Sequence, residues 1–141
     1  MVDEKDIEIL KILENNARVP LTRIATKLGI SDVAVRKRLR KLEEEGVIKS
    51  YKVVFDHSKL GYRARAIVGF DLAPEKLLVT VKELAERPEV KWIAITSGDH
   101  MVLVEVWASD NDELSAFMKE LSEKYGAERV KPSIIVEMVK E

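Results

Sequence analysis

Apolar side chains recur at helical spacing in the first part of the chain. In residues 3–14, four apolar residues recur at roughly the spacing of a helix, and Ile9 lies beside them. The four are Ile7, Leu10, Ile12 and Leu13. A second helix is predicted from Pro20, whose missing N–H would have no helical partner in a first turn. Its apolar face is expected to hold Leu21, Ile24, Ala25 and Leu28. Gly29 suits the left-handed residue that ends such a helix.

A third helix is predicted to begin at Ser31, because a serine hydroxyl accepts the backbone hydrogen bond that caps a helix. Val35, Leu39 and Leu42 follow at spacings of four and three and predict its buried stripe. The short Gly-Ile-Ser connection between the second and third helices is typical of a helix-turn-helix. In that motif the second of the two helices enters the DNA major groove.

The side of the third helix away from its apolar stripe is strongly basic. Five of the residues in 36–41 are Lys or Arg. Arginine presents a two-pronged donor to guanine, and flanking cations reach phosphates. A charge run alone more often marks a solvated helix face. The tight turn, the cap and the preceding helix favour DNA binding instead.

Beta-branched and aromatic residues follow Gly46, from Val47 to Phe55, and predict a strand. This strand could form a wing beside the helices or an arm that pairs with another subunit. Turn-forming residues and Gly61 come next. We therefore expect a first domain over residues 1–55, a linker over 56–61 and a second domain over 62–141.

The rear half has the pattern β-α-β-β-α-β. Alternation from Tyr62 to Phe70 predicts a strand, Pro74 opens a helix, and 90–95 and 101–107 read as a hairpin. A helix capped at Asp110 and a last strand reaching Val136 complete the order. The expected helix faces carry Leu77, Leu78, Val81, Leu84 and Ala85, then Leu114, Phe117, Met118 and Leu121. The fold class is thus α+β, a helix-turn-helix followed by a ferredoxin-like sandwich. A second copy could cover the sheet's open face.

The composition favours some binding partners and disfavours some kinds of site. Residues 1–65 hold 15 Lys and Arg against 10 Asp and Glu, whereas the remainder holds 9 against 15. This basic front suits nucleic acid. There is no cysteine and there are two histidines, which disfavours metal sites and cysteine nucleophiles. The charge-rich, amide-poor composition resembles that of thermophile proteins. With no long apolar run and no signal-like start, we expect a cytoplasmic protein without a membrane segment.

The stretch LTRIATKLGISDVAVRKRLRKLEEEGVIKSY resembles the DNA-binding half of the Lrp/AsnC, or feast/famine, regulators. DEKDIEILKILENNAR is similar to their first helix, and ITSGDHMVLVEVW is similar to the hairpin of their effector domain, in an archaeal form. The resemblance covers essentially the whole chain. It implies a winged helix-turn-helix, homodimers that assemble into tetramers or octamers, double-stranded DNA as partner, and an amino-acid effector. It implies no metal and no other cofactor.

The resemblance also assigns residues. The DNA-binding set is Ser31, Asp32, Val33, Arg36, Lys37 and Arg40, with Arg38 and Lys41 as phosphate partners. The ligand-binding set is Thr96, Ser97, Gly98, Asp99, His100 and Met101. Loop amides and Ser97 could donate to a carboxylate and Asp99 could accept from an ammonium. Gly98 would leave room in a narrow cleft. Asp32 could serve the helix dipole or accept from cytosine.

Other interpretations stay open at this point. Gly98-Asp99 could be a plain hairpin turn without a ligand. Trp92 and Trp107 suit the core or a subunit interface, and His100 suits packing or the surface. A DNA-packaging protein of the same fold is the alternative function. An enzyme is disfavoured because no nucleophile–base pair is visible. Strand alternation places Glu105, the one carboxylate that could join Asp99, on a polar face.

Overall fold

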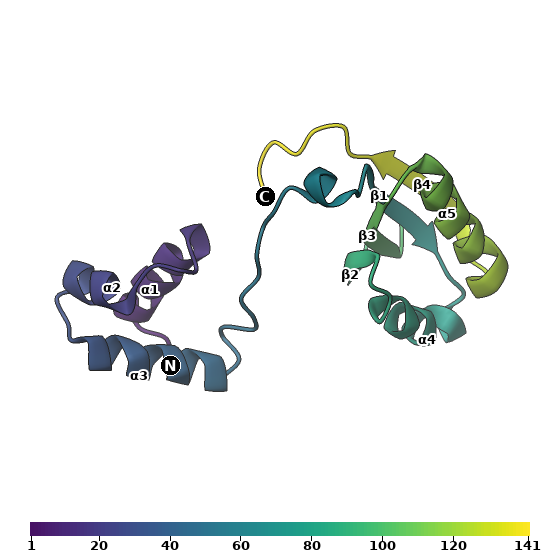
Figure 1. Cartoon of the computed structure of the whole chain (residues 1–141). Coiled ribbons are helices and arrows are strands. Elements are labelled where there is room, and N and C mark those ends of the chain that lie inside the picture. The colour runs from purple at the N-terminus through teal and green to yellow at the C-terminus, as the bar shows by residue number, and fades with distance from the viewer. The chain divides into compact units, whose positions relative to one another are not determined.

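Three helices build the first part of the chain: α1 (Glu4–Asn15), α2 (Leu21–Leu28) and α3 (Asp32–Glu44) (Figure 1). The computed structural model describes residues 1–141 and divides them into two units, Met1–Val53 and Val54–Glu141. The first unit therefore contains the predicted helix-turn-helix.

The turn between α2 and α3 depends on two local features. Gly29 ends α2 at φ 68°, in the left-handed region that glycine enters without steric cost. Ser31 then caps α3, because its Oγ accepts from the backbone N–H of Ala34 at 3.1 Å. Both residues have the roles that the sequence predicted. The connection that joins the two helices is therefore short, and its conformation has little freedom to change.

The core of the first unit gathers around Ile9, Ile24, Ala25, Val35 and Leu39. Two expectations for α1 are reversed here. Ile7, predicted on the apolar face, is 44% exposed, whereas Ile9, predicted beside that face, is completely buried. The inward row of α1 begins at buried Asp6, so Ile9 lies one turn further on and Ile7 is turned away.

The strand predicted over residues 47–55 does not form within the single chain, and its pairing with another subunit stays a prediction. This segment has no strand partner, and Val53 and Val54 are exposed. Its beginning is used differently: the N–H groups of Val47 and Ile48 donate to the carbonyl of Leu42 and finish α3. Beta-branched residues favour an extended backbone, but a strand also needs a neighbour to bond.

The second unit begins with a 3₁₀ helix, η1 (His57–Leu60), within the predicted linker. The βαββαβ order then follows as predicted. Its elements are β1 (Ala64–Asp71), α4 (Pro74–Ala85), β2 (Val90–Ile95), β3 (Val102–Ala108), α5 (Asn111–Tyr125) and β4 (Glu128–Ile134). The strands pair antiparallel in the order β2-β3-β1-β4. This confirms the α+β fold class.

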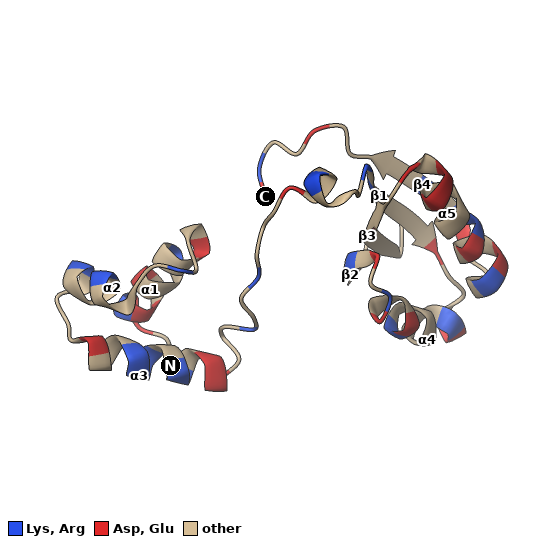
Figure 2. Ribbon diagram, viewed as in Figure 1, with Lys and Arg blue, Asp and Glu red and all other residues tan.

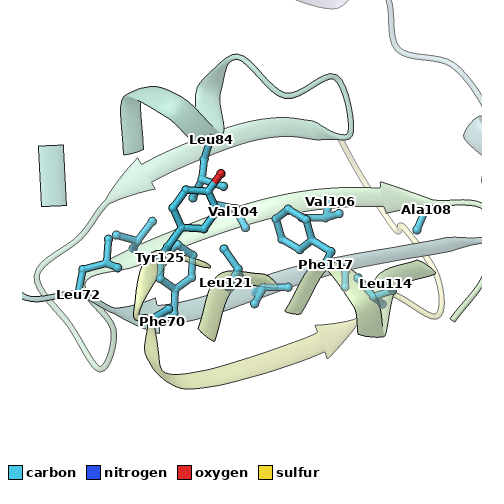
Figure 3. Packing of buried hydrophobic residues seen from close by; sticks show 14 of the residues in the cluster. Phe70, Leu72, Leu84, Val104, Val106, Ala108, Leu114, Phe117, Leu121 and Tyr125 are labelled. Atoms are coloured by element: carbon cyan, nitrogen blue, oxygen red, sulfur yellow. The ribbon is translucent and has the colours of Figure 1, made fainter. Parts of the chain in front are cut away.

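Strand alternation decides which side chains enter the core of the second unit. Ala66, Val68 and Phe70 of β1 face the same way as Val102, Val104 and Val106 of β3, and all are fully buried. The helices cover this face, and Figure 3 shows Leu121 and Phe117 of α5 packed among these side chains. The odd-numbered positions consequently face the opposite side of the sheet.

Three residues expected in apolar faces or strands are exposed instead. Leu78 and Ala85, expected on the apolar face of α4, are exposed, because the inward row runs through Leu77, Val81 and Leu84. Val136, expected in the last strand, lies beyond β4 and is exposed.

Candidate functional site

The outward face of α3 is a set of unpaired cations. Val35, Leu39 and Leu42 are buried, which turns Arg36, Lys37 and Arg40 to the solvent. None of these three has a carboxylate within ion-pair distance. Val33, also on this side, is 69% exposed. Figure 2 shows the basic segments along the middle of α3. The face can therefore meet an anionic surface without first breaking internal ion pairs.

The residues near the two ends of α3 are either acidic or already engaged in a hydrogen bond or an ion pair. Asp32 lies in the first turn, where the helix dipole favours a negative charge. The Ser31 oxygen is used as the cap, so the hydroxyl proton is what it could still offer to a ligand. Lys41 is exposed and lies 4.0 Å from Glu45 one turn later, a weak pair at a solvated surface.

Arg38 has a different environment from its basic neighbours. Its Nη1 donates to Asp3 at 2.7 Å and to Asp6 at 3.0 Å, both at the start of α1. The hydrogen bond from Arg38, helped by that from the Asp6 backbone N–H, lowers the pKa of Asp3 to about 2. The guanidinium is thus paired with carboxylates of its own unit, although the sequence placed it with the phosphate partners.

Four exposed residues on α2 were missed at the sequence level: Thr22, Arg23, Thr26 and Lys27. With Pro20 they line a shallow hollow of about 430 Å³. In helix-turn-helix proteins the first helix of the motif crosses the DNA backbone. The signal was present in the sequence, since Arg23 and Lys27 stand one turn apart, opposite the buried Ile24 and Ala25.

The predicted ligand residues form the loop between β2 and β3. The Thr96 N–H donates to the Met101 carbonyl at 2.8 Å, and the Thr96 hydroxyl donates to the His100 carbonyl. The Met101 N–H donates to Asp71 on β1 at 2.9 Å. Ser97, Gly98 and Asp99 are exposed at the tip. The structure therefore brings all six together, with three residues anchoring the loop and three presented to solvent.

His100 fixes this loop to the sheet through a close approach. A Cβ on Gly69 of β1 would lie 2.6 Å from the His100 Cδ2 atom, closer than real atoms pack. The His100 Nδ1 atom is buried and has no hydrogen-bond partner. A packing role for His100 matches the sequence interpretation. Around Gly98, by contrast, a Cβ would meet no atom within 4 Å, so no cleft of this chain requires that glycine.

Glu105 is a buried carboxylate and not a member of an exposed polar face. Its oxygens accept from Arg65 Nε at 2.9 Å, Trp92 Nε1 at 3.0 Å and Trp107 Nε1 at 2.7 Å. Burial alone would raise the pKa of Glu105, but the hydrogen bonds from Arg65 and both indoles outweigh it and lower the pKa. The carboxylate is saturated with donors, so it is not available for acid–base chemistry with Asp99.

The Trp107 ring continues this network. It packs against Phe55, His57 and Tyr62, with ring centroids 5.2 to 5.7 Å away. Lys91 Nζ lies 4.7 Å from the centre of the Trp107 ring. The tryptophan therefore anchors the beginning of the second unit, in keeping with the core role considered for it, and is only slightly exposed. Trp92 is more accessible, at 39%.

Two other kinds of feature are absent from the chain. No group of three or more His, Cys, Asp or Glu residues is arranged to hold a metal ion. No helix is both long enough and apolar enough to cross a membrane.

Family models match both halves of the chain. Residues 2–49 match a model described as winged helix-turn-helix DNA-binding. Residues 65–141 match the Lrp/AsnC ligand binding domain.

Curated relatives match over nearly the full length. The HTH-type transcriptional regulator LrpA of Pyrococcus horikoshii is 43% identical, covering 99% of this chain and 100% of its own. LysM of Saccharolobus solfataricus, also an HTH-type transcriptional regulator, is 33% identical, covering 96% of this chain and 94% of its own. These relatives are transcriptional regulators and not enzymes, and the Pyrococcus likeness fits the thermophile-like composition.

Solved structures agree in fold. An AsnC family transcriptional regulator from Agrobacterium tumefaciens superposes with a TM-score of 0.84 at 28% identity, covering 99% of this chain and 93% of its own. A transcriptional regulator from Neisseria meningitidis, solved as a complex with L-Met, gives a TM-score of 0.88 at 20% identity, covering 100% and 94%.

The contact between Gly69 and His100 predicts a pair of contrasting variants. Gly69→Ala should lower the free energy of unfolding of the second unit by about 1–3 kcal/mol, because the new methyl must displace the His100 ring. Gly98→Ala should change it by less than about 0.5 kcal/mol. Urea unfolding followed by the fluorescence of Trp92 and Trp107 measures this, because both lie in the second unit. Equal effects of the two variants would contradict the assigned close approach.

The Glu105 network predicts a pH dependence. A lowered pKa in the folded state means that ionised Glu105 adds stability above its unfolded pKa, and that this is lost as pH falls through the folded pKa. Glu105→Gln should therefore cost about 1–3 kcal/mol at neutral pH, because Arg65 loses its buried partner and keeps only the partly exposed Glu141. The deficit relative to wild type should shrink as the pH falls below about 4.3. A deficit that stays constant across this range would show that the charge of Glu105 contributes nothing.

Proposed function

This chain belongs to the Lrp/AsnC family of transcriptional regulators, and on that premise we propose that it recognises specific DNA sites in a manner controlled by an amino acid. It carries the DNA-binding helix-turn-helix and the ligand-binding domain of the family. The observation that carries the proposal is the row of unpaired cations on the outward face of α3.

For DNA, we assign base-edge contacts to the N-terminal part of α3, through Ser31, Asp32, Val33 and Arg36. Lys37, Arg40 and Lys41 then reach phosphates on either side of the groove. Phosphate contacts set affinity and its dependence on salt, whereas base contacts set sequence preference. Arg23 and Lys27 of α2 suit the DNA backbone beside the groove. The functional domains proposed are residues 1–55 for DNA and 62–141 for ligand and assembly, joined by 56–61.

For the effector, we propose a free amino acid at the loop formed by Thr96, Ser97, Gly98, Asp99, His100 and Met101. The exposed tip offers backbone N–H groups and the Ser97 hydroxyl to a carboxylate, and Asp99 to an ammonium. The L-Met complex of the Neisseria meningitidis regulator supports an amino acid as the ligand class. Since a Gly98 methyl would meet only open space in one chain, any crowding at Gly98 must come from another subunit.

Control by the effector requires a change of assembly. An amino acid can alter DNA affinity only if it binds one assembly better than another. We propose a homodimer that builds tetramers or octamers, with the effector bound where subunits meet, acting in the cytoplasm. A symmetric dimer reads symmetric half-sites about one helical turn apart.

A competition titration tests DNA recognition. Labelled DNA from directly upstream of the gene encoding this chain is challenged with unlabelled copies and with scrambled DNA at two salt concentrations. A specific regulator should prefer the native fragment by roughly a thousandfold or more. Equal competition by both DNAs, together with steep salt sensitivity, would instead indicate DNA packaging.

The same titration assigns Arg36. Arg36→Ala should reduce discrimination between the native and scrambled duplexes by about 1–3 kcal/mol if the guanidinium reads a base. Lys37→Ala, one residue away on the same exposed face, is the matched comparison and should weaken binding to both duplexes alike. A uniform loss with Arg36→Ala would make Arg36 a phosphate contact and move base recognition elsewhere on α3.

A further inference from the structure

Arg38 lies in the inward row of α3 and not in the outward one. Val35, Arg38 and Leu42 follow one another at spacings of three and four, which places them on one side of a helix. Val35 and Leu42 of this row are buried, and the Arg38 side chain is 29% exposed. Its charge is therefore directed toward the other helices of the first unit, away from the face that presents Arg36 and Arg40.

Two aspartates at the start of α1 receive this charge. Arg38 Nη1 lies 2.8 and 2.7 Å from the two carboxylate oxygens of Asp3 and 3.0 Å from Asp6 Oδ1. The aspartates are also bonded to each other's backbone: the Asp6 N–H donates to Asp3 at 2.9 Å, and the Asp3 N–H donates to Asp6 at 3.1 Å. The three residues thus form one hydrogen-bonded cluster that joins the N-terminus of α1 to the middle of α3. We call it the Asp-Arg clamp.

The clamp supplies what the apolar core of this small unit does not. Apolar contacts are non-directional and permit small rotations or sliding of one helix on another. Charge-assisted hydrogen bonds are directional and fix both groups in one geometry. Asp6 has a side chain only 9% exposed, so its end of the clamp is anchored within the fold. A rotation of α3 about its axis would break the clamp and also turn Arg36 away from its outward position.

Building on the proposed DNA-binding function, we infer that the Asp-Arg clamp of Asp3, Asp6 and Arg38 sets the orientation of α3 for DNA. Arg38 is a positioning residue that acts through this clamp and does not bind a phosphate. The two aspartates, although negative and close to a DNA-binding helix, then promote DNA binding.

The sign of the effect of Asp3→Asn separates this inference from simple electrostatics. Asparagine caps a helix as well as aspartate does, so α1 keeps its cap while Arg38 loses one of its two charge partners and keeps only Asp6. Removing a negative charge near DNA should by itself tighten binding. Loss of the clamp should instead weaken binding, by about three- to tenfold. Glu4→Gln is the matched control, because Glu4 is the next residue, is exposed and forms no ion pair.

The salt dependence distinguishes a positioning residue from a residue that contacts a phosphate. A residue that neutralises a phosphate contributes about 0.9 to the slope of log K against log salt. Arg38→Gln and Arg38→Lys should weaken binding and leave this slope unchanged, whereas Lys41→Gln should reduce it by about one. Binding of the full chain to the upstream duplex and to a random-sequence duplex is measured over a series of KCl concentrations. Far-ultraviolet circular dichroism checks that each variant keeps its helices.

Each outcome bears on the inference. Weaker binding by Asp3→Asn at an unchanged slope, with Glu4→Gln neutral or tighter, supports the clamp. Binding by Asp3→Asn as tight as that of Glu4→Gln, or a slope lowered by about one in Arg38→Lys, overturns it while DNA binding itself stands. If Arg38→Gln fails to fold, Arg38→Lys and Asp3→Asn still decide. Absence of salt-dependent binding by the wild type to either duplex would refute the proposed function and the clamp's role together.

Discussion

The burial of one apolar stripe on α3 determines which residues of the first unit face the solvent. Val35, Leu39 and Leu42 must leave water, so the helix is confined to a narrow range of rotation about its axis. That rotation sends Arg36, Lys37 and Arg40 outward and Arg38 inward, although all four belong to one run of basic residues. The difference between a DNA contact and an internal clamp is therefore a difference of one or two positions on a helix. The left-handed Gly29 and the Ser31 cap determine the residue at which α3 begins, and they thereby permit this rotation of the helix.

In the second unit, the alternation of side chains along the strands likewise decides which residues are buried. Even-numbered residues of β1 and β3 fill the core beneath the helices, and the odd-numbered ones face the other side of the sheet. There Arg65, Glu105 and the two tryptophans satisfy one another, so a buried carboxylate serves structure and not catalysis. The same side of the sheet carries Gly69, whose missing side chain gives His100 its place. The loop proposed to meet an effector is thus anchored to the sheet at one end while its tip is free.

The sequence predicted most of the helices, the order of the strands and the helix-turn-helix, because these follow from local periodicity and caps. It failed where a partner from elsewhere decides the outcome. Residues 51–55 have the composition of a strand but no strand partner in the chain, and Ile7 yields its place to Ile9 because the inward row of α1 runs through Asp6, which pairs with Arg38. The burial of Glu105 depends on Arg65 and Trp92, two donors from other strands, as well as on the nearby Trp107. The candidate DNA-binding residues could be located on α3 from spacing alone, but the separate role of Arg38 needed its contact with Asp3.

The central claim is that α3 enters the major groove in each half of a symmetric DNA site. Dimethyl sulfate protection on the upstream duplex tests it directly, because the reagent attacks guanine N7 in the major groove and adenine N3 in the minor groove. The account predicts protected guanines in two clusters about one helical turn apart, or a multiple of it, with adenines between them still reactive. Protection confined to adenines, or spread evenly along the duplex, would contradict it.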